Sequence, residues 1–367
     1  SFARRNYRTC DESEIYLSAN ETSVNDETLD YETNSEDFIS IKSVSKRSIY
    51  INKYTNWSSP IRYFIDRGLN KRKIKTVLAY FQKYTCLNFE DNSNYSILNS
   101  NLAYLNESFC SSLVGKYIEN VDGDTDIYLT NACSNDFGVV AHETAHALGL
   151  SHEHQRFDRD NYIAINSSLI PDTYLESIMK KDKIDIYATF NISYDYGSIM
   201  HYPSKSSITN GEQFIYVKSI SPLNKMLGQR FKLSFNDFKL LNHYYCVHKC
   251  DNFKQKCKNG GYLYWNNCTR CVCPKEYTGE DCSKPKNRSK NCTFNEYFAN
   301  GNRTFFNSSG IGRCIHYINT TIGDRISVSL PFINTKNADI CRTDIGLEVK
   351  YKNDKGTTGL CLCGNYK

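Results

Sequence analysis

The sequence predicts an α+β fold for its central part, followed by small disulfide-rich modules. The alternation of apolar and polar residues from Ile61 to Asp66 is typical of a strand. Asn70 can cap a helix whose apolar residues recur at intervals of three and four positions. These residues form one buried stripe: Ile74, Val77, Leu78 and Phe81. From Cys250 onward cysteines are crowded, which indicates that disulfides replace a hydrophobic core there.

Composition indicates an extracellular globular protein. The 367 residues are enough for two or three domains, and 40% of them are hydrophobic. Sixteen cysteines without a paired C-x-x-C metal framework favour an oxidising compartment, hence secretion. Several N-x-S/T sequons agree with this: Asn20, Asn56, Asn94, Asn166, Asn302 and Asn319. A net charge of +5 gives no case for nucleic acid, and no apolar run is long enough to span a membrane.

One stretch predicts a zinc site. His142 and His146 lie four residues apart, so on a helix both imidazoles project from one face and can reach a single ion. Gly149 can end the helix and let the chain turn, which brings in His152 as a third ligand. Three protein ligands leave one position open for a water whose pKa falls to about 7 on zinc. Glu143 is placed to take a proton from that water.

This spacing is that of the metzincin pattern H-E-x-x-H-x-x-G-x-x-H, which also requires a later methionine turn. Residues 198–202, Ser-Ile-Met-His-Tyr, supply that turn, and residues 152–156 read His-Glu-His-Gln-Arg. Together these motifs closely resemble the astacin family of zinc endopeptidases, over about residues 48–246. The resemblance implies a two-lobed catalytic domain with a twisted sheet and a zinc helix, and predicts Zn²⁺ as the cofactor.

The resemblance also implies roles for single residues. His142, His146 and His152 match the zinc ligands, and Glu143 matches the general base. Tyr202 matches a tyrosine that binds zinc weakly at rest and hydrogen-bonds the oxyanion when substrate is bound. Two further residues match structural positions: Met200 packs beneath the metal, and Glu153 engages the new amino terminus made by activation.

Substrate binding is also implied by the resemblance. The lower edge strand of the sheet, near residues 111–116, is expected to pair with an extended peptide through backbone hydrogen bonds. Arg230 resembles a basic residue beside the pocket for the residue that follows the cut, which would favour an acidic side chain there. A solvated arginine is the alternative.

The chain before this domain predicts a zymogen. Residues 1–47 are expected to be a partial pro-segment, because residues 11–37 hold ten acidic and no basic residues. Cleavage after Arg47 would leave Ser48 as the amino terminus, although a solvated basic loop is the alternative. The family's short F-x-G-D latency motif is missing. Cys10 or Asp37 could occupy the metal instead, so latency has no assigned residue.

Four cysteines of the predicted catalytic domain, residues 48–247, fit the family's two bridges, Cys86 with Cys246 and Cys110 with Cys133. The first closes nearly the whole domain, which would contribute on the order of 4 to 5 kcal/mol in the chain-entropy model. At the end of the domain, Ser234 and Asp237 predict a capping box for a closing helix.

Residues 250–282 resemble an EGF-like module. The six cysteines alone allow 15 pairings, and the resemblance selects Cys250–Cys268, Cys257–Cys271 and Cys273–Cys282. A zinc knuckle is the alternative, which the sequons and the extra cysteines disfavour. Residues 292–367 resemble a partial or divergent CUB module, a β-sandwich, with strand-like alternation at residues 325–330 and 345–351. Cys361 and Cys10 have no evident partner.

The sequence thus predicts a secreted zinc endopeptidase, made as a zymogen, that cuts extended proteins. Its partners would be protein substrates, including matrix or cuticle proteins, and proteins that bind the EGF-like and CUB-like modules. The alternative is a catalytically silent adhesion or matrix-binding protein on the same scaffold. The intact set of His142, His146, His152, Glu143 and Tyr202 argues against that alternative.

Overall fold

The computed structural model describes residues 13–18, 47–50, 57–93, 101–116, 125–183, 187–254, 256–286, 296–309 and 313–366. The chain divides into two compact units. The larger unit is formed by residues 45–286 and 338–362, and the smaller by residues 1–44, 287–337 and 363–367.

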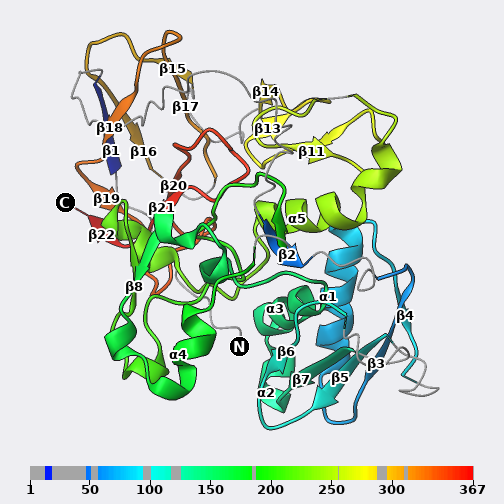
Figure 1. Cartoon of the computed structure of the whole chain (residues 1–367). Coiled ribbons are helices and arrows are strands. Elements are labelled where there is room, and N and C mark those ends of the chain that lie inside the picture. The colour runs from blue at the N-terminus through cyan, green and yellow to red at the C-terminus, as the bar shows by residue number, and fades with distance from the viewer. Residues whose placement is uncertain are drawn as a thin grey trace, which may run out of the picture. The chain divides into compact units, whose positions relative to one another are not determined.

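The larger unit is built on a five-stranded sheet (Figure 1). Its spatial order is β4 (Phe89–Asp91), β3 (Ile61–Ile65), β5 (Leu102–Asn106), β7 (Thr125–Leu129) and β6 (Ser111–Ser112). The first four strands are parallel neighbours, whereas β6 runs antiparallel to β7 at the edge. The predicted strand from Ile61 and the predicted edge strand are confirmed, although the edge strand is shorter than residues 111–116.

Helix α1 (Lys71–Tyr84) forms where the apolar spacing predicted it. The Asn70 side chain accepts a hydrogen bond from the Lys73 backbone N–H, which caps the first turn. The predicted stripe lies in the core with at most 2% of each side chain exposed: Ile74, Val77, Leu78 and Phe81. At about 25 cal/mol per Å² of apolar surface, burial of each such side chain contributes on the order of 2 kcal/mol.

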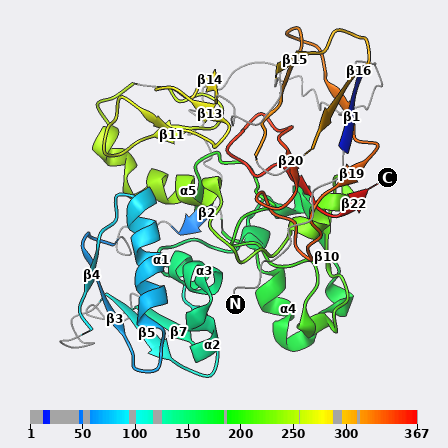
Figure 2. The same ribbon diagram turned by 180° about the vertical axis from the view of Figure 1, so that it is seen from behind.

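Helix α3 (Phe137–Ala147) follows the short helix α2 (Asn131–Asn135), and Figures 1 and 2 both show it beside α1 and the sheet. The Asp136 carboxylate caps it by accepting from the backbone N–H groups of Gly138 and Val139. The helix ends before Gly149, which has φ +98, so the predicted break is confirmed. Three side chains hold its last turns: Tyr104 contacts Thr144, Trp57 contacts Ala147 and Tyr245 contacts Leu148.

The rest of the larger unit has short elements. The helices are α4 (Asp172–Met179), α5 (Phe235–Tyr245), η2 (Glu153–Gln155), η3 (Arg159–Asn161), η4 (Ser167–Leu169), η5 (Ser207–Thr209), η6 (Ser221–Met226) and η7 (Val247–Cys250). Paired strands are β2 (Arg47–Tyr50) with β9 (Tyr187–Thr189), β8 (Ile163–Ile165) with β10 (Ile215–Val217), β11 (Tyr262–Leu263) with β12 (Cys271–Val272), and β13 (Tyr277–Thr278) with β14 (Lys284–Pro285). The predicted capping box between Ser234 and Asp237 is present at the start of α5.

Five disulfides in this unit match the expected pairings: Cys86–Cys246, Cys110–Cys133, Cys250–Cys268, Cys257–Cys271 and Cys273–Cys282. Cys361 is buried and carries a free thiol. Cys10, Asp37 and Cys292 lie outside the described residues.

Residues 338–362 belong to the same compact unit as the zinc helix. Their strands β20 (Leu347–Val349) and β21 (Leu360–Leu362) form an antiparallel pair. The predicted module over residues 292–367 stays a prediction, because the compact units divide that stretch differently.

The smaller unit consists of short strands. Its three-stranded sheet has the order β16 (Thr304–Ser308), β1 (Ser13–Ser18), β18 (Ser327–Ser329). Two further pairs are β15 (Glu296–Phe298) with β17 (Tyr317–Asn319) and β19 (Ile333–Asn334) with β22 (Asn365–Tyr366). Across the described ranges of both units, none of the helices combines the length and the apolar character that crossing a bilayer requires.

Candidate zinc site

The structure brings the three predicted histidines together. His142 and His146 stand one turn apart on α3, and the turn at Gly149 returns the chain so that His152 faces them. Ligand atoms of all three lie within 4.8 Å of one another. The Nε2 atoms of His146 and His152 are 3.0 Å apart. A local sequence motif has therefore produced a convergent set of three imidazoles.

Hydrogen bonds on the other side of each ring fix its orientation. His142 Nδ1 lies 2.9 Å from the carbonyl oxygen of Ile199, and His146 Nδ1 lies 2.7 Å from the carbonyl oxygen of Leu150. A carbonyl only accepts, so each Nδ1 carries the proton and each Nε2 presents its lone pair. His152 Nδ1 similarly lies 3.1 Å from Gln155 Oε1. This arrangement, with a backbone or side-chain partner behind each ring, is common around metal ligands.

Burial keeps these rings neutral. It lowers the pKa of His146 to about 4 and those of His142 and His152 well below the ordinary value. Neutral imidazoles are the protonation state that coordinates a metal. Three neutral nitrogen donors in one pocket fit zinc with one position left for water.

Glu143 lies between the two histidines on α3 and is 7% exposed. Burial raises the pKa of its carboxyl to about 7, opposed by the positive charge of Arg230 and by a hydrogen bond from the Ser112 backbone. Ser112 belongs to edge strand β6, so the carboxylate lies where that edge meets the histidines. A carboxylate with such a pKa suits proton transfer at neutral pH.

Tyr202 also reaches the site. Its ring centroid lies 4.5 Å from that of His152, edge to face, and 4.0 Å from that of His154. Burial raises the pKa of its phenol, so the group is a neutral hydrogen-bond donor at pH 7. The tyrosine thus lies beside a predicted zinc ligand, and its role as a catalytic residue stays a prediction.

The methionine turn contacts the chain next to the zinc ligands. Met200 is buried in the main core cluster, and its carbonyl accepts from the Glu153 backbone N–H at 3.1 Å. Arg230 is not a fully solvated arginine, because its Nη1 donates to the carbonyl oxygens of Ile199 and His201 at 2.7 and 3.1 Å. Its charge therefore lies beside the turn.

The model of the peptidase family described as Astacin matches residues 49–246. This chain belongs to the astacin family. Its cofactor is zinc, and the buried His142 and His146 with the half-buried His152 form the group that could hold the ion.

Nematode relatives of this astacin are similar along much of the chain. Zinc metalloproteinase nas-34 of Caenorhabditis elegans is 30% identical over 88% of this chain and 52% of its own length. Zinc metalloproteinase dpy-31 of Brugia malayi is 35% identical over 65% of this chain and 40% of its own length. The chain spans about half the length of the curated relatives it matches. Among solved structures, high choriolytic enzyme 1, a hatching enzyme zinc-protease from Oryzias latipes, has 24% identity and a TM-score of 0.47, and covers 54% of this chain and 98% of its own.

Two features of the site were missed from the sequence. His154 is fully buried against Tyr202, and neither ring nitrogen has a hydrogen-bond partner among the described residues. Asp195 is also buried, and its backbone N–H donates to Glu153. The run His152-Glu153-His154 was a local signal for the first, whereas nothing in the sequence near residue 195 marks the second.

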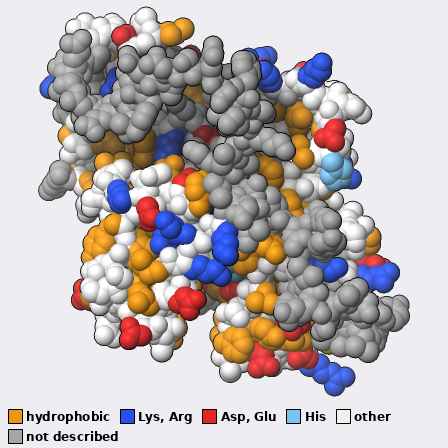
Figure 3. Space-filling model, viewed as in Figure 1, with side chains coloured by type: hydrophobic (Ala, Val, Ile, Leu, Met, Phe, Trp, Pro, Cys, Tyr) orange, Lys and Arg blue, Asp and Glu red, His pale blue; other side chains and the backbone are white. Residues whose placement is uncertain are grey.

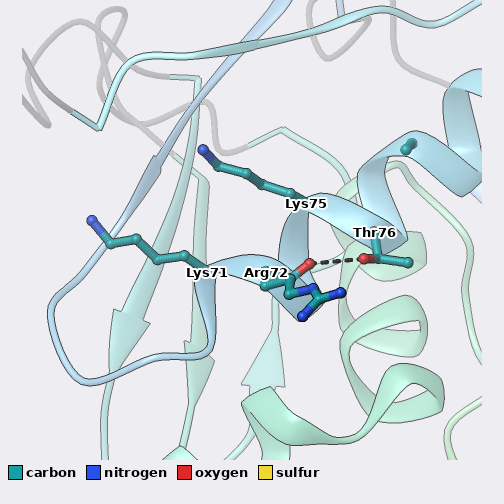
Figure 4. Close-up of a pocket in the computed structure, with 5 residues that line it drawn as sticks. Lys71, Arg72, Lys75 and Thr76 are labelled. Carbon is teal, nitrogen blue, oxygen red and sulfur yellow. Dashed lines mark hydrogen bonds between the residues drawn. The ribbon is translucent and has the colours of Figure 1, made fainter.

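A shallow hollow lies on another surface of this astacin, over the exposed face of α1 (Figure 4). It is lined by Lys71, Arg72, Lys75, Thr76 and Ala79. Lys75 pairs with Asp91 at 2.6 Å. None of the predicted site residues lines this hollow, so we assign it no part in the zinc site.

Proposed function

We propose that this chain is the catalytic part of a secreted zinc endopeptidase that is made as a zymogen. The observation that carries the proposal is the convergence of three neutral imidazoles, two of them buried and one half-buried, beside the carboxyl of Glu143. An adhesion protein on a silent scaffold is not favoured, because such a role would not require this buried polar group of residues to stay complete.

Each polar group would have one task. Bound zinc would supply a Lewis acid that polarises the scissile carbonyl and acidifies water. Glu143 would accept a proton at a carboxylate oxygen and return it to the leaving amine. Tyr202 would donate its phenolic hydrogen to the oxygen that gains negative charge, which stabilises the transition state more than the ground state.

The edge strand β6 would hold the substrate. Among the described strands only β7 pairs with it, and the Ser112 backbone also contacts Glu143. An extended peptide added to this edge would thus lie against the proton-transfer group. Near the edge, Phe109 and Leu113 are 51% and 54% exposed. Figure 3 shows hydrophobic side chains gathered over the part of the unit where β6 and β7 lie, which suits apolar substrate side chains.

Arg230 supports a preference for an acidic residue after the cut. Within the described part of the chain its side chain makes three hydrogen bonds, all from Nη1, to the carbonyl oxygens of residues 199, 201 and 229. The guanidinium is thereby fixed beside the turn, and a second terminal nitrogen is left to bind a carboxylate.

Activation would follow cleavage after Arg47, the first residue of β2. Ile49 of that strand pairs with Ala188 and also bridges Leu150, two residues before His152. Glu153 would receive the new amino terminus at Ser48, and burial raises the pKa of its carboxyl to about 8. Arg156 Nη1 already lies 3.2 Å from Glu153 Oε1 and favours the charged form of that carboxyl, so the ammonium would be a second cation beside it.

The disulfides support secretion, and the three bridges of residues 250–282 support an EGF-like module. Residues 292–367 would form a partial or divergent CUB-like module, of which residues 338–362 belong to the larger compact unit. Both modules would bind extracellular proteins, and the substrates would be extended matrix or cuticle proteins.

The test is hydrolysis of a proteome-derived peptide library by protein cleaved at Arg47. We expect cleavage that a chelator abolishes and zinc restores, with acidic residues enriched after the cut. The control is Glu143→Ala, which should bind zinc but cut nothing. Hydrolysis that survives this substitution would refute the mechanism, and an absence of acidic preference would refute the role of Arg230.

A further inference from the structure

A second buried polar cluster lies next to the zinc site and has no assigned role. Its centre is Asp195, which is 2% exposed and forms no ion pair among the described residues. A carboxylate in such a place is costly unless hydrogen-bond donors surround it. The donors that satisfy it therefore decide whether this part of the unit can keep its shape.

Two of the three donors come from one residue far away in the chain. Thr358 gives its backbone N–H to Asp195 Oδ1 at 3.3 Å and its hydroxyl to Oδ2 at 3.1 Å. The third donor is the Gly197 N–H, at 2.9 Å from Oδ1. A Cβ on Gly197 would lie 2.6 Å from the Thr358 side chain, so only glycine permits this approach. The segment and the loop are thus fitted to one another.

Asp195 in turn holds the residues around the zinc ligands. Its N–H donates to Glu153 Oε1 at 2.8 Å, and Glu153 directly follows His152. Its carbonyl accepts from the Ser198 N–H at 3.0 Å, which begins the methionine turn. The Ile199 carbonyl of that turn contacts His142 Nδ1 at 2.9 Å. Hydrogen bonds therefore connect Asp195 with the chain next to His152, through Glu153, and with His142, through the methionine turn.

The segment that carries Thr358, residues 338–362, is held by further contacts within the same unit. Lys352 Nζ donates to the Tyr194 carbonyl oxygen at 3.0 Å and lies 5.0 Å from the Tyr196 ring centroid. Thr357 is 2% exposed and receives a hydrogen bond from the Asn236 side chain. Several independent contacts thus fix Thr358 against Asp195.

We propose that Thr358 is a positioning residue for the zinc site, and that residues 338–362 are an integral part of the catalytic unit. By satisfying the Asp195 carboxylate, the segment orders the loop from Tyr194 to Tyr202 and the chain at Glu153. A catalytic domain that ends near Cys246 would leave this carboxylate with the Gly197 N–H as its one donor among those that it has in the structure. The inference rests on the zinc site of the proposed function.

The test is zinc affinity, measured by competition with a chromophoric chelator on the full chain. Thr358→Val keeps the shape of the side chain and removes the hydroxyl donor. We expect it to weaken zinc binding about tenfold, the lower end of what loss of a supporting partner costs, and to lower kcat with little change in KM. Thr358→Ser keeps the hydroxyl donor and should have the zinc affinity and kcat of the wild type. If Thr358 acted only through its bulk, Thr358→Val would be the unaffected variant instead.

Thr343→Val is the matched control, because it lies on the same segment and no hydrogen bond of its hydroxyl is recorded within the described residues. It should leave zinc affinity unchanged. If Thr358→Val does not fold, Lys352→Met decides the matter, since it should weaken zinc binding in the same direction. Wild-type zinc affinity in a folded Thr358→Val or in Lys352→Met would overturn the inference. A wild-type chain without stoichiometric zinc would instead overturn the proposed function.

Discussion

The zinc helix and the Asp195 cluster lie side by side, yet the chain specifies them in different ways. All three histidines come from the eleven residues 142–152, and a helix followed by one glycine turn is enough to bring them together. The Asp195 cluster joins Glu153, Asp195 and Thr358, which are separated by 42 and 163 residues. One site depends on local geometry, and the other depends on the whole unit.

The zinc helix can be recognised from the sequence, whereas the Asp195 cluster cannot and is more easily lost. A local site survives as long as its helix and turn survive, and its spacing can be seen in the sequence. A cluster assembled from distant segments is invisible in the sequence, and any change that loosens the unit will disturb it. Variants at the two sites can separate these two kinds of dependence.

The largest effect is expected at the local site itself. His146→Ala removes one of three zinc ligands, and proteolysis should fall by roughly a thousandfold or more, in line with metal affinity lost with the ligand. The exposed residue His248 supplies the control, since His248→Ala should change neither activity nor zinc content, both measured after gel filtration. Full activity in His146→Ala would break the assignment of the zinc ligands.

The next effect concerns the whole unit. The Cys86–Cys246 bridge closes 160 residues, whereas Cys110–Cys133 closes 23. In the loop-entropy model, replacing both cysteines of the first pair by serine should lower the free energy of unfolding by about 4 to 5 kcal/mol. The same replacement in the second pair should lower it by roughly 3 kcal/mol. Urea unfolding of the two variants measures this order. A reversed order would show that native-state contacts, not loop length, dominate.

Tyr202→Phe tests the hydroxyl donor of the local site and should not alter the fold. Loss of the hydroxyl donor should lower kcat by about a hundredfold, the effect of removing one oxyanion donor, and leave zinc bound. Tyr174 is 47% exposed, so Tyr174→Phe is the matched control and should behave like wild type. Stopped-flow hydrolysis of a fluorogenic peptide distinguishes the two, and equal kcat in both variants would contradict the role of Tyr202.

The smallest effect is a dependence of stability on pH at Asp182. Its Oδ1 accepts from Ser151 Oγ at 2.8 Å, and burial raises its pKa to about 7. The folded chain therefore binds a proton that the unfolded chain releases near pH 4, so this residue costs increasing stability as the pH rises toward 7. Asp182→Asn should accordingly be more stable than wild type at pH 8, by about 2 kcal/mol.

At pH 3 the advantage of Asp182→Asn should shrink toward zero, because that pH lies below both the folded pKa of about 7 and the ordinary value of 3.8, so both states of the wild type are then largely protonated at this residue. Thermal unfolding at the two pH values checks the difference. An advantage that is equal at both would mean that titration of Asp182 is not its cause.

Local signals account for most of what the sequence predicted correctly. The cap at Asn70, the capping box at Ser234 and the turn at Gly149 each depend on residues within a few positions, and the structure has all three. Helix α4 was missed, because only Ile178 of its residues is fully buried and so it shows little periodic apolar pattern. The contact between Thr358 and Asp195 could not be predicted, because no rule of spacing relates residues 163 positions apart.

The most direct measurement of the central claim is the metal content of the purified chain together with its zinc X-ray absorption spectrum. We predict one zinc per chain, with a first shell of three imidazole nitrogens and one oxygen ligand, and loss of this spectrum in His146→Ala. A chain that binds no stoichiometric zinc, or that holds it through sulfur from a cysteine such as Cys361, would contradict the account.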